Sequence, residues 1–259
     1  MKKIVFWLAF IVGIIAVIGA CSKSDEESST AATTSCAGVS GSTEVTSCSG
    51  TASGSITGID NITLSGTYSQ NTAAGVLGWG VDNSTGCVDN TTMVSGFSIG
   101  STSAPTGTNS MIFEDVVTSS SSIATNYKFY SDTSCQTEIA TLTLGYTDFT
   151  VGDNVTGLTT SGGYPSSATK VSYTQSCAGM KASTDAGATF LTAAFGSAGV
   201  SPTVGTTHSC SIGGSTSNAF VKLDNESAVP VVWGATFLYW DDSATSDWTS
   251  GVDTLVTLP

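Results

Sequence analysis

The chain has 259 residues, of which 40% are hydrophobic, and a formal net charge of −13 at pH 7. All of its basic residues are lysines, so it lacks the cationic surface with which nucleic-acid-binding proteins displace counterions from phosphates. This composition excludes nucleic acid as a partner, whereas the hydrophobic content and five tryptophans suffice for a folded core.

The N-terminal residues have the pattern of an export signal. Lys2 and Lys3 precede an uncharged, apolar run from Ile4 to Ala20. At ~1.5 Å per residue this run spans about 26 Å, which is short for a hydrocarbon core of ~30 Å. We therefore expect residues 1–20 to be a cleaved signal peptide; the alternative is a plain membrane-spanning helix.

The end of this run resembles the lipobox of bacterial lipoproteins, in the residues Ile18-Gly19-Ala20-Cys21. The resemblance implies cleavage before Cys21 and lipidation of its thiol, so that acyl chains make the membrane a partner. Residue 22 is Ser and not Asp, which in Gram-negative lipoproteins favours the outer membrane over the inner one. The resemblance thus implies a lipid-anchored protein of the bacterial cell envelope.

Residues 21–54 are rich in Ser, Thr, Gly and Ala and cannot bury enough apolar surface to fold alone, so we expect a disordered tether. Thr34-Ser35-Cys36-Ala37-Gly38 is echoed by Thr46-Ser47-Cys48-Ser49-Gly50. The echo is either a small disulfide loop or a coincidence of composition. Residues 55–259 are then the disulfide-bonded β domain.

Six cysteines remain after lipidation of Cys21: Cys36, Cys48, Cys87, Cys135, Cys177 and Cys210. An even number in an exported chain predicts three disulfides, for which 15 connectivities are open. Pairing in sequence order is the simplest arrangement. The only histidine, His208, precedes Cys210 by two residues, but a zinc site would need two further ligands, so disulfides are favoured.

Hydrophobic residues alternate with polar ones in short segments that are bounded by Gly, Asn, Asp and Ser. Each segment predicts a β-strand with one buried face, except the last, which is apolar on both faces. The segments are 62–69, 140–146, 169–174, 218–224 and 231–240. Short strands at this spacing predict a mainly β protein, an antiparallel barrel or sandwich.

One segment has helical spacing instead. Its apolar residues are Phe190, Leu191, Ala194 and Phe195. Ser183 or Thr184 could cap its start, and Gly196 ends it. We expect one short helix, packed on the sheet and held there by a bridge between Cys177 and Cys210.

Three motifs resemble a group of bacterial lipocalin-like β-barrel domains: Gly66-Thr67-Tyr68, then Cys87, then a strand that ends in Tyr130-Ser131-Asp132-Thr133-Ser134-Cys135. The likeness covers about residues 62–175, and that family usually has Trp where this chain has Tyr68. It implies a barrel, a Cys87–Cys135 bridge and an apolar interior that could take a small apolar ligand. It carries over neither a particular ligand nor an activity.

Gly96-Phe97-Ser98-Ile99-Gly100 matches the G-x-S-x-G pattern of serine hydrolases, with His208 downstream. Such a nucleophile must stand on a turn from a strand into a helix, which the following residues, with Pro105 and Gly107, cannot form. We predict that Ser98 is not catalytic and that it lies on or beside a strand, opposite to Phe97 and Ile99.

Asp241, Asp242 and Asp247 lie close together in sequence and could attract Ca²⁺. Three carboxylates fall short of the 6–8 oxygens that Ca²⁺ takes, so a solvated acidic loop is the favoured interpretation, with neither metal nor other cofactor.

The sequence therefore predicts a membrane-anchored envelope lipoprotein whose non-catalytic β domain has a binding or structural role, with an envelope protein as one kind of partner. The alternative is a lipocalin-like carrier of a small apolar ligand, and the third hypothesis is a serine hydrolase that uses Ser98.

Overall fold

The computed structural model describes residues 48–60, 62–70, 81–82, 86–89, 91–99, 101–159, 164–195, 200–212, 214, 216–224, 237–242, 246–248 and 253–257. The predicted signal peptide, Cys21 and Cys36 lie outside these residues. Among the helices of the described segments, none has the length and apolar character needed to cross a membrane.

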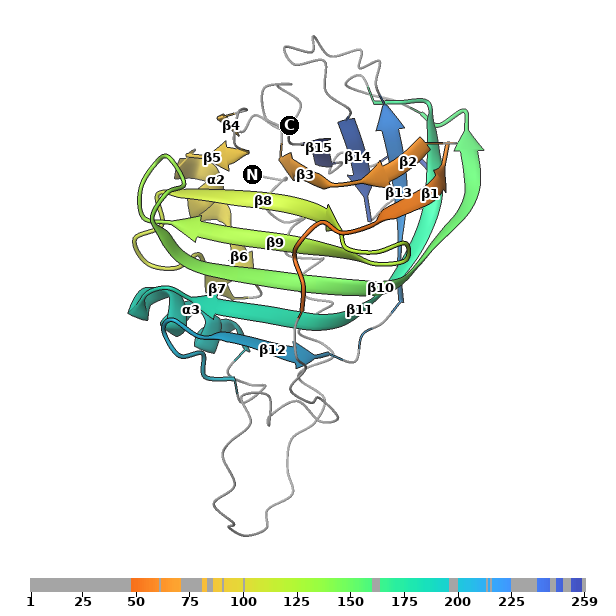
Figure 1. Cartoon of the computed structure of the whole chain (residues 1–259). Coiled ribbons are helices and arrows are strands. Elements are labelled where there is room, and N and C mark those ends of the chain that lie inside the picture. Colours follow the sequence, from red (N-terminus) through yellow and green to blue (C-terminus); the bar gives the residue numbers. More distant parts are fainter. Residues whose placement is uncertain are drawn as a thin grey trace, which may run out of the picture.

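Eight antiparallel strands form a barrel (Figure 1). They are β3 (Thr67–Gln70), β8 (Ser110–Val117), β9 (Ile123–Tyr130), β10 (Glu138–Thr156), β11 (Ser167–Ala182), β13 (Thr216–Asp224), β14 (Phe237–Asp241) and β15 (Asp253–Thr257). The order around the sheet is β3-β15-β14-β13-β11-β10-β9-β8, and β8 pairs again with β3. The prediction of a mainly β, antiparallel fold is confirmed, and of its two alternatives the sheet takes the barrel-like one.

The long strands β8 to β11 extend beyond the ring. Residues 169–174 of β11 pair with β13, whereas residues 177–181 pair with β12 (Thr207–Ser211). Likewise, residues 114–116 of β8 pair with β3, whereas Met111 and Ile112 pair with β5 (Cys87–Val88), which continues to β4 (Val81–Asp82). We call the end closed by β3, β13, β14 and β15 the barrel half, and the end flanked by β5 and β12 the covered half.

The covered half takes its name from the elements packed on the inner face of its sheet. These are α2 (Thr91–Gly96), the hairpin of β6 (Ser98–Ile99) and β7 (Thr102–Ser103), and α3 (Asp185–Phe195) (Figure 1). The ring of Phe129 lies between those of Phe97 and Phe190, with centroid distances of 5.0 and 5.1 Å. Edge-on aromatic contacts of this kind pack these elements against the sheet of the covered half.

Helix α3 confirms the predicted helix. The Gly187 N–H donates to Thr184 Oγ1 over 3.2 Å, so Thr184 is the N-cap, and Phe190, Leu191 and Phe195 are buried. A Cβ on Gly187 would come within 2.2 Å of the Ile139 carbonyl oxygen. Glycine is therefore needed where α3 touches β10. The six-residue α2 was not predicted.

A separate hairpin of β1 (Ser55–Ile59) and β2 (Ile62–Ser65) lies across the mouth of the barrel half (Figure 1). It contacts β8 and β13, which are four places apart in the ring of eight, and Ile56, Ile59 and Leu64 are buried. Asp60, at the hairpin tip, forms an ion pair with Lys222 of β13. The single strand predicted for residues 62–69 is thus wrong, because Gly66, with a φ of +80°, turns the chain from the hairpin into β3.

Cys87 and Cys135 form the disulfide that the lipocalin-like resemblance implied. Asp132 orders the turn that carries Cys135. Its carboxylate accepts hydrogen bonds from the backbone N–H groups of Ser134, Gln136 and Thr137, and these bonds, with that of the Ser134 hydroxyl, lower its pKa. The Tyr-x-Asp-x-x-Cys motif is therefore a turn that fixes a disulfide.

The other pairings in sequence order are wrong. Cys48 is bonded to Cys177, and Cys210 is disulfide-bonded to a partner outside the described residues. Cys210 stands opposite Ala178 in the β11–β12 pair, so Cys177 points to the other face of the sheet. A Cys177–Cys210 bridge is therefore excluded by the pleat, and α3 is not held by one.

The Cys48–Cys177 bridge also attaches the end of the predicted tether. Cys48 N–H donates to Ser209 Oγ (3.1 Å), Asn126 Nδ2 donates to the Gly50 carbonyl (2.9 Å), and Ser53 N–H donates to the Val117 carbonyl (3.1 Å). Residues 48–54 thus belong to the folded domain, although they form no strand.

Candidate functional site

The interior of the barrel half contains two carboxyl groups in an otherwise largely apolar lining. Asp115 shares the inward face of β8 with Met111, Phe113 and Val117. Asp242 follows β14 directly, in alternation with Leu238 and Trp240, which belong to the same core. Burying carboxyl groups is unfavourable unless they are paired or hydrogen-bonded. The interaction partners and the protonation of both residues must therefore be considered.

Asp115 is 8% exposed and has one hydrogen bond from a side chain, in which Thr125 Oγ1 donates to its carboxylate over 2.6 Å. Its partner in the neighbouring strand is Tyr68 of β3. Burial raises the pKa of Asp115 to about 7, and the negative charges of Glu114 and Asp242 add to this, whereas the Thr125 bond opposes it. Asp115 therefore titrates near neutral pH.

Asp242 is the second inward carboxyl. Burial and, to a lesser degree, the adjacent charge of Asp241 raise its pKa to about 6. Asp241 itself is 1% exposed and points to the opposite face of β14, in register with Phe220. Asp242 is close enough to Asp115 to raise the pKa of that group as well.

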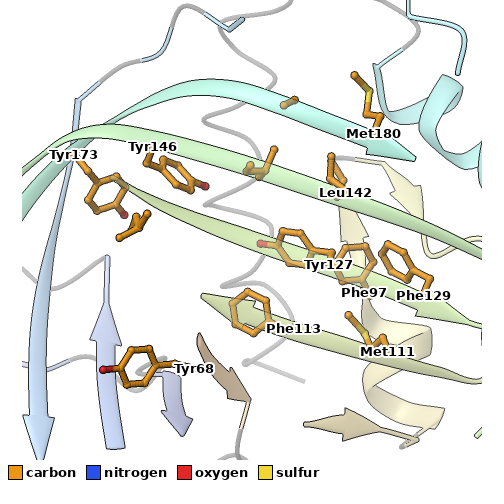
Figure 2. Packing of buried hydrophobic residues seen from close by; sticks show 14 of the residues in the cluster. Tyr68, Phe97, Met111, Phe113, Tyr127, Phe129, Leu142, Tyr146, Tyr173 and Met180 are labelled. Atoms are coloured by element: carbon orange, nitrogen blue, oxygen red, sulfur yellow. The ribbon is translucent and has the colours of Figure 1, made fainter. Parts of the chain in front are cut away.

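Aromatic side chains of β10, β11 and β14 line the same interior as the two carboxyl groups. Tyr173 of β11 lies 5.2 Å from Tyr146 of β10 and 5.5 Å from Trp240 of β14, between ring centroids. Phe149 lies 6.3 Å from both Tyr173 and Trp240. Figure 2 shows that the hydroxyls of Tyr146 and Tyr173 point into the barrel. We call Asp115, Thr125, Tyr146, Tyr173, Trp240 and Asp242 the acidic–aromatic cluster.

The hydroxyl of Tyr146 is buried without a hydrogen-bond partner among the described residues. Thr125 interacts with the Tyr146 hydroxyl and opposes the rise of its pKa, but the contact lacks the geometry of a hydrogen bond, and the Thr125 proton is donated to Asp115. Burial and the charges of Asp115 and Asp242 together raise the pKa of Tyr146 far above its usual value. The hydroxyl of Tyr173, by contrast, is not one of the buried groups without a partner, and an interaction with Trp240 opposes the rise of its pKa that burial causes.

No lysine of the described segments neutralises the cluster. Lys128, Lys181 and Lys222 form ion pairs with Glu114, Glu138 and Asp60, and Lys170 is exposed. The described residues also contain no group of three His, Cys, Asp or Glu side chains that could hold a metal ion. The cluster therefore offers acceptors and ring faces, and its formal charge is negative when the carboxyls ionise.

The residues considered for hydrolysis have other surroundings. Ser98 lies on β6, which follows helix α2 and pairs with β7, so the order required for a nucleophile elbow is reversed. Phe97 and Ile99 are buried and Ser98 is only partly buried, as predicted for opposite faces. The Nε2 atom of His208 accepts a hydrogen bond from the Thr203 N–H over 3.2 Å.

The three aspartates considered for Ca²⁺ do not form one group. Asp241 and Asp242 point to opposite faces of β14, and Asp247 accepts a hydrogen bond from the Thr159 N–H over 2.7 Å. The expectation of a solvated loop is wrong for Asp241, which is buried, and for Asp242, which is partly buried within the barrel.

The sequence analysis missed the acidic–aromatic cluster, although one signal was present. In the strand "SMIFEDVV" two adjacent acids, Glu114 and Asp115, interrupt an apolar run. Because neighbouring residues of a strand point to opposite faces, one of the two had to face the core. Nothing in the sequence shows that Tyr146, Tyr173 and Asp242 converge on it.

Comparison of the chain with protein-family models gives no match, and comparison with curated proteins gives no relative at the threshold used.

Proposed function

We propose that this protein is a lipid-anchored lipoprotein of the bacterial envelope, and that its barrel half binds a small ligand at the acidic–aromatic cluster. The observation that carries the binding role is the Tyr146 hydroxyl, buried beside two carboxyl groups with no hydrogen-bond partner among the described residues. A buried hydroxyl without a partner costs about 1–3 kcal/mol, so a group that meets it on binding contributes favourably.

A purely structural role explains the cluster less well. In the covered half, the inner face of the same four long strands is packed with apolar rings, such as those of Phe97, Phe129 and Phe190. A barrel that served only as a scaffold would gain stability from the same solution in its other half. Retained polar groups in an apolar interior are typical of binding sites, where a few of them fix the ligand.

The non-catalytic role rests on the surroundings of Ser98 and His208. A serine hydroxyl is a weak nucleophile unless a base takes its proton, and the one histidine of the chain, His208 on β12, accepts a bond from the Thr203 N–H. A labelling experiment with a fluorophosphonate tests this directly: we expect no modification of Ser98, and stoichiometric labelling would restore the hydrolase hypothesis.

The anchor is tested by the variant Cys21→Ser. If the lipobox is used, this variant stays unprocessed or is released from membranes, whereas the wild type partitions into detergent. A variant that is still cleaved and still partitions with detergent would refute the lipoprotein assignment.

The binding role is tested by calorimetry on the full chain in lipid nanodiscs. Three probes represent the classes of ligand that the interior could bind, an arylalkyl amine, an arylalkyl alcohol and a long-chain alcohol: 2-phenylethylamine, 2-phenylethanol and dodecanol. We expect at least one of them to bind with a 1:1 stoichiometry and to change the fluorescence of Trp240, which is part of the cluster. A Trp240→Phe variant that loses the fluorescence change but keeps the heat of binding identifies the reporter. If none of the three binds, the binding role is wrong; binding of dodecanol alone favours the carrier of a small apolar ligand.

A further inference from the structure

We infer that the ligand of the acidic–aromatic cluster is a small primary amine, bound as its ammonium ion. The inference rests on the proposed binding role and specifies its chemistry: the ammonium group lies among Asp115, Asp242 and the Tyr146 hydroxyl, and the organic part lies against the neighbouring rings.

The acceptors of the cluster match the donors of a primary ammonium group. Such a group has three N–H donors and no acceptor. Asp115 and Asp242 supply carboxylate oxygens from β8 and from the end of β14, and Tyr146 supplies a hydroxyl oxygen from β10. The Thr125 bond to Asp115 occupies part of one carboxylate only, since a carboxylate can accept several hydrogen bonds. Both carboxyls act electrostatically on Tyr146, and Asp115 and Tyr146 face the same barrel interior, Asp115 in alternation with Phe113 and Val117.

The rings of the cluster suit the same ligand. A cation near the face of Trp or Tyr gains about 0.5–1 kcal/mol at exposed sites and about 2 when desolvated. Tyr173 lies between Tyr146 and Trp240, and Phe149 extends the aromatic wall, so an ammonium held by the carboxyls has ring faces beside it. The same rings provide apolar surface for the carbon skeleton.

The other charge classes fit less well. An anion would meet two carboxyls, and the lysines of the described segments are paired elsewhere or exposed. A divalent metal ion needs more ligands than two carboxyls supply, and the described residues hold no group of three acidic, His or Cys side chains. An organic cation requires only partial desolvation and single hydrogen bonds.

Binding of an ammonium ion should release protons near neutral pH. Asp115 faces Tyr68, Thr125, Tyr146, Tyr173 and Asp242 within the barrel, and Glu114 is its neighbour in sequence. None of these groups is a cation, so without a ligand burial keeps a proton on Asp115 up to a pH of about 7. A bound ammonium favours the ionised carboxylate and displaces that proton. Amine affinity therefore increases as the pH rises from 5 to 7.5.

The experiment compares each amine with the alcohol of the same skeleton, on the full chain in nanodiscs. The pairs are n-butylamine with n-butanol and 2-phenylethylamine with 2-phenylethanol. We expect each amine to bind at least tenfold more tightly than its alcohol, and we expect its heat at pH 6.5 to differ between phosphate and MES buffers, neither of which is a primary amine, because a proton is released.

Three variants locate the site. Asp115→Asn removes one interior charge at constant shape and should weaken amine binding at least tenfold while it abolishes most of the buffer dependence. Tyr146→Phe should weaken binding severalfold. Asp153→Asn removes the same charge from an exposed position of β10 and should leave amine affinity unchanged.

The outcomes separate this inference from the proposed function. If the alcohols bind as tightly as the amines, and Asp115→Asn has no effect on either, the barrel binds a neutral ligand and the amine inference is wrong. If amines and alcohols all fail to bind, and dodecanol fails as well, both proposals are wrong. Amine binding that Asp153→Asn weakens as much as Asp115→Asn would show a surface charge effect, which also overturns the inference.

Discussion

The covered half and the barrel half are built on the same strands, β8 to β11, yet their interiors differ in kind. In the covered half the chain supplies its own filling, as in the stack of Phe97, Phe129 and Phe190. In the barrel half the same sheet surrounds Asp115 and Asp242, with a hydroxyl that nothing described satisfies. In the covered half, folding packs apolar side chains against one another. In the barrel half, folding buries polar groups whose desolvation is not fully offset by interactions within the protein.

This difference predicts that the two halves respond in opposite ways to substitution. In the covered half, removing a side chain removes packing and should destabilise the protein. In the barrel half, removing a polar group that lacks a partner should stabilise the ligand-free protein and weaken ligand binding, as expected where stability is exchanged for function. The following variants test the comparison, in order of decreasing expected effect, all without added amine.

Phe129→Ala should be the most damaging change. The side chain is 0% exposed and contacts rings on both sides, and truncation of a buried Phe costs about 3–5 kcal/mol. Urea unfolding with the disulfides intact measures the effect. The control Phe129→Leu keeps most of the volume and should cost clearly less; equal losses would show that ring packing is not what seals the covered half.

Asp115→Asn should change the pH dependence of stability. The pKa of Asp115 is about 7 in the folded protein and near 3.8 in an unfolded chain, so the folded state binds more protons between these values. Wild-type stability should therefore fall as the pH rises from about 4 to 7, on the order of 2–4 kcal/mol at ~1.4 kcal/mol per pKa unit.

The Asn variant should lose most of this slope and be more stable than the wild type at pH 8, with a smaller slope left from Asp242, whose pKa is raised in the same direction. Asp153→Asn, at an exposed site, is the matched control and should keep the wild-type slope. A wild type whose stability is flat between pH 4 and 8 would contradict the buried, uncompensated state of Asp115.

Tyr146→Phe and Tyr173→Phe should have opposite signs. Loss of the Tyr146 hydroxyl removes a buried group without a partner and should stabilise the protein by about 1 kcal/mol. Loss of the Tyr173 hydroxyl removes its favourable interaction with Trp240 and should cost about 1 kcal/mol. Thermal unfolding of both variants at pH 7 decides the matter, and destabilisation by both would mean that Tyr146 has a partner in the folded protein.

Thr184→Ala should have the smallest effect, about 1 kcal/mol of destabilisation, because it removes the N-cap of α3 from the covered half. Thr184→Ser keeps the oxygen and should restore nearly all of the stability. Hydrogen exchange at Gly187 and Ala188 gives a local readout, and unchanged exchange in the Ala variant would argue against the cap.

The covered half was the more predictable of the two from the sequence. The spacing of Phe190, Leu191 and Phe195 predicted α3, and Thr184 was one of two proposed caps. Such signals are local, because a helix has its period and its cap within a dozen residues. The Cys87–Cys135 bridge was implied by the lipocalin-like resemblance, and the motif that carries Cys135 is itself local, because it lies within one turn.

The candidate site was not predictable, because its residues come from five strands and span the sequence from Asp115 to Asp242. Alternation in "SMIFEDVV" shows that one acid faces inward, but only the register of β3, β9, β10 and β14 brings Tyr68, Thr125, Tyr146 and Asp242 to Asp115. The Cys48–Cys177 bridge was missed for a related reason. Its partners are 129 positions apart, and the face that each cysteine occupies depends on a register that the sequence does not give.

The Cys48–Cys177 bridge also determines how the domain bears mechanical load. Tension that reaches Cys48 along the chain passes through the disulfide into the middle of β11, which is paired with β10 on one side and with β12 and β13 on the other. The polypeptide from residue 49 to residue 176 forms a covalent loop that this tension bypasses. The hairpin across the barrel mouth and strand β3 are therefore shielded from force, although they come first in the chain. Under reducing conditions the same pull would instead peel β1 away, and the domain would yield from its mouth.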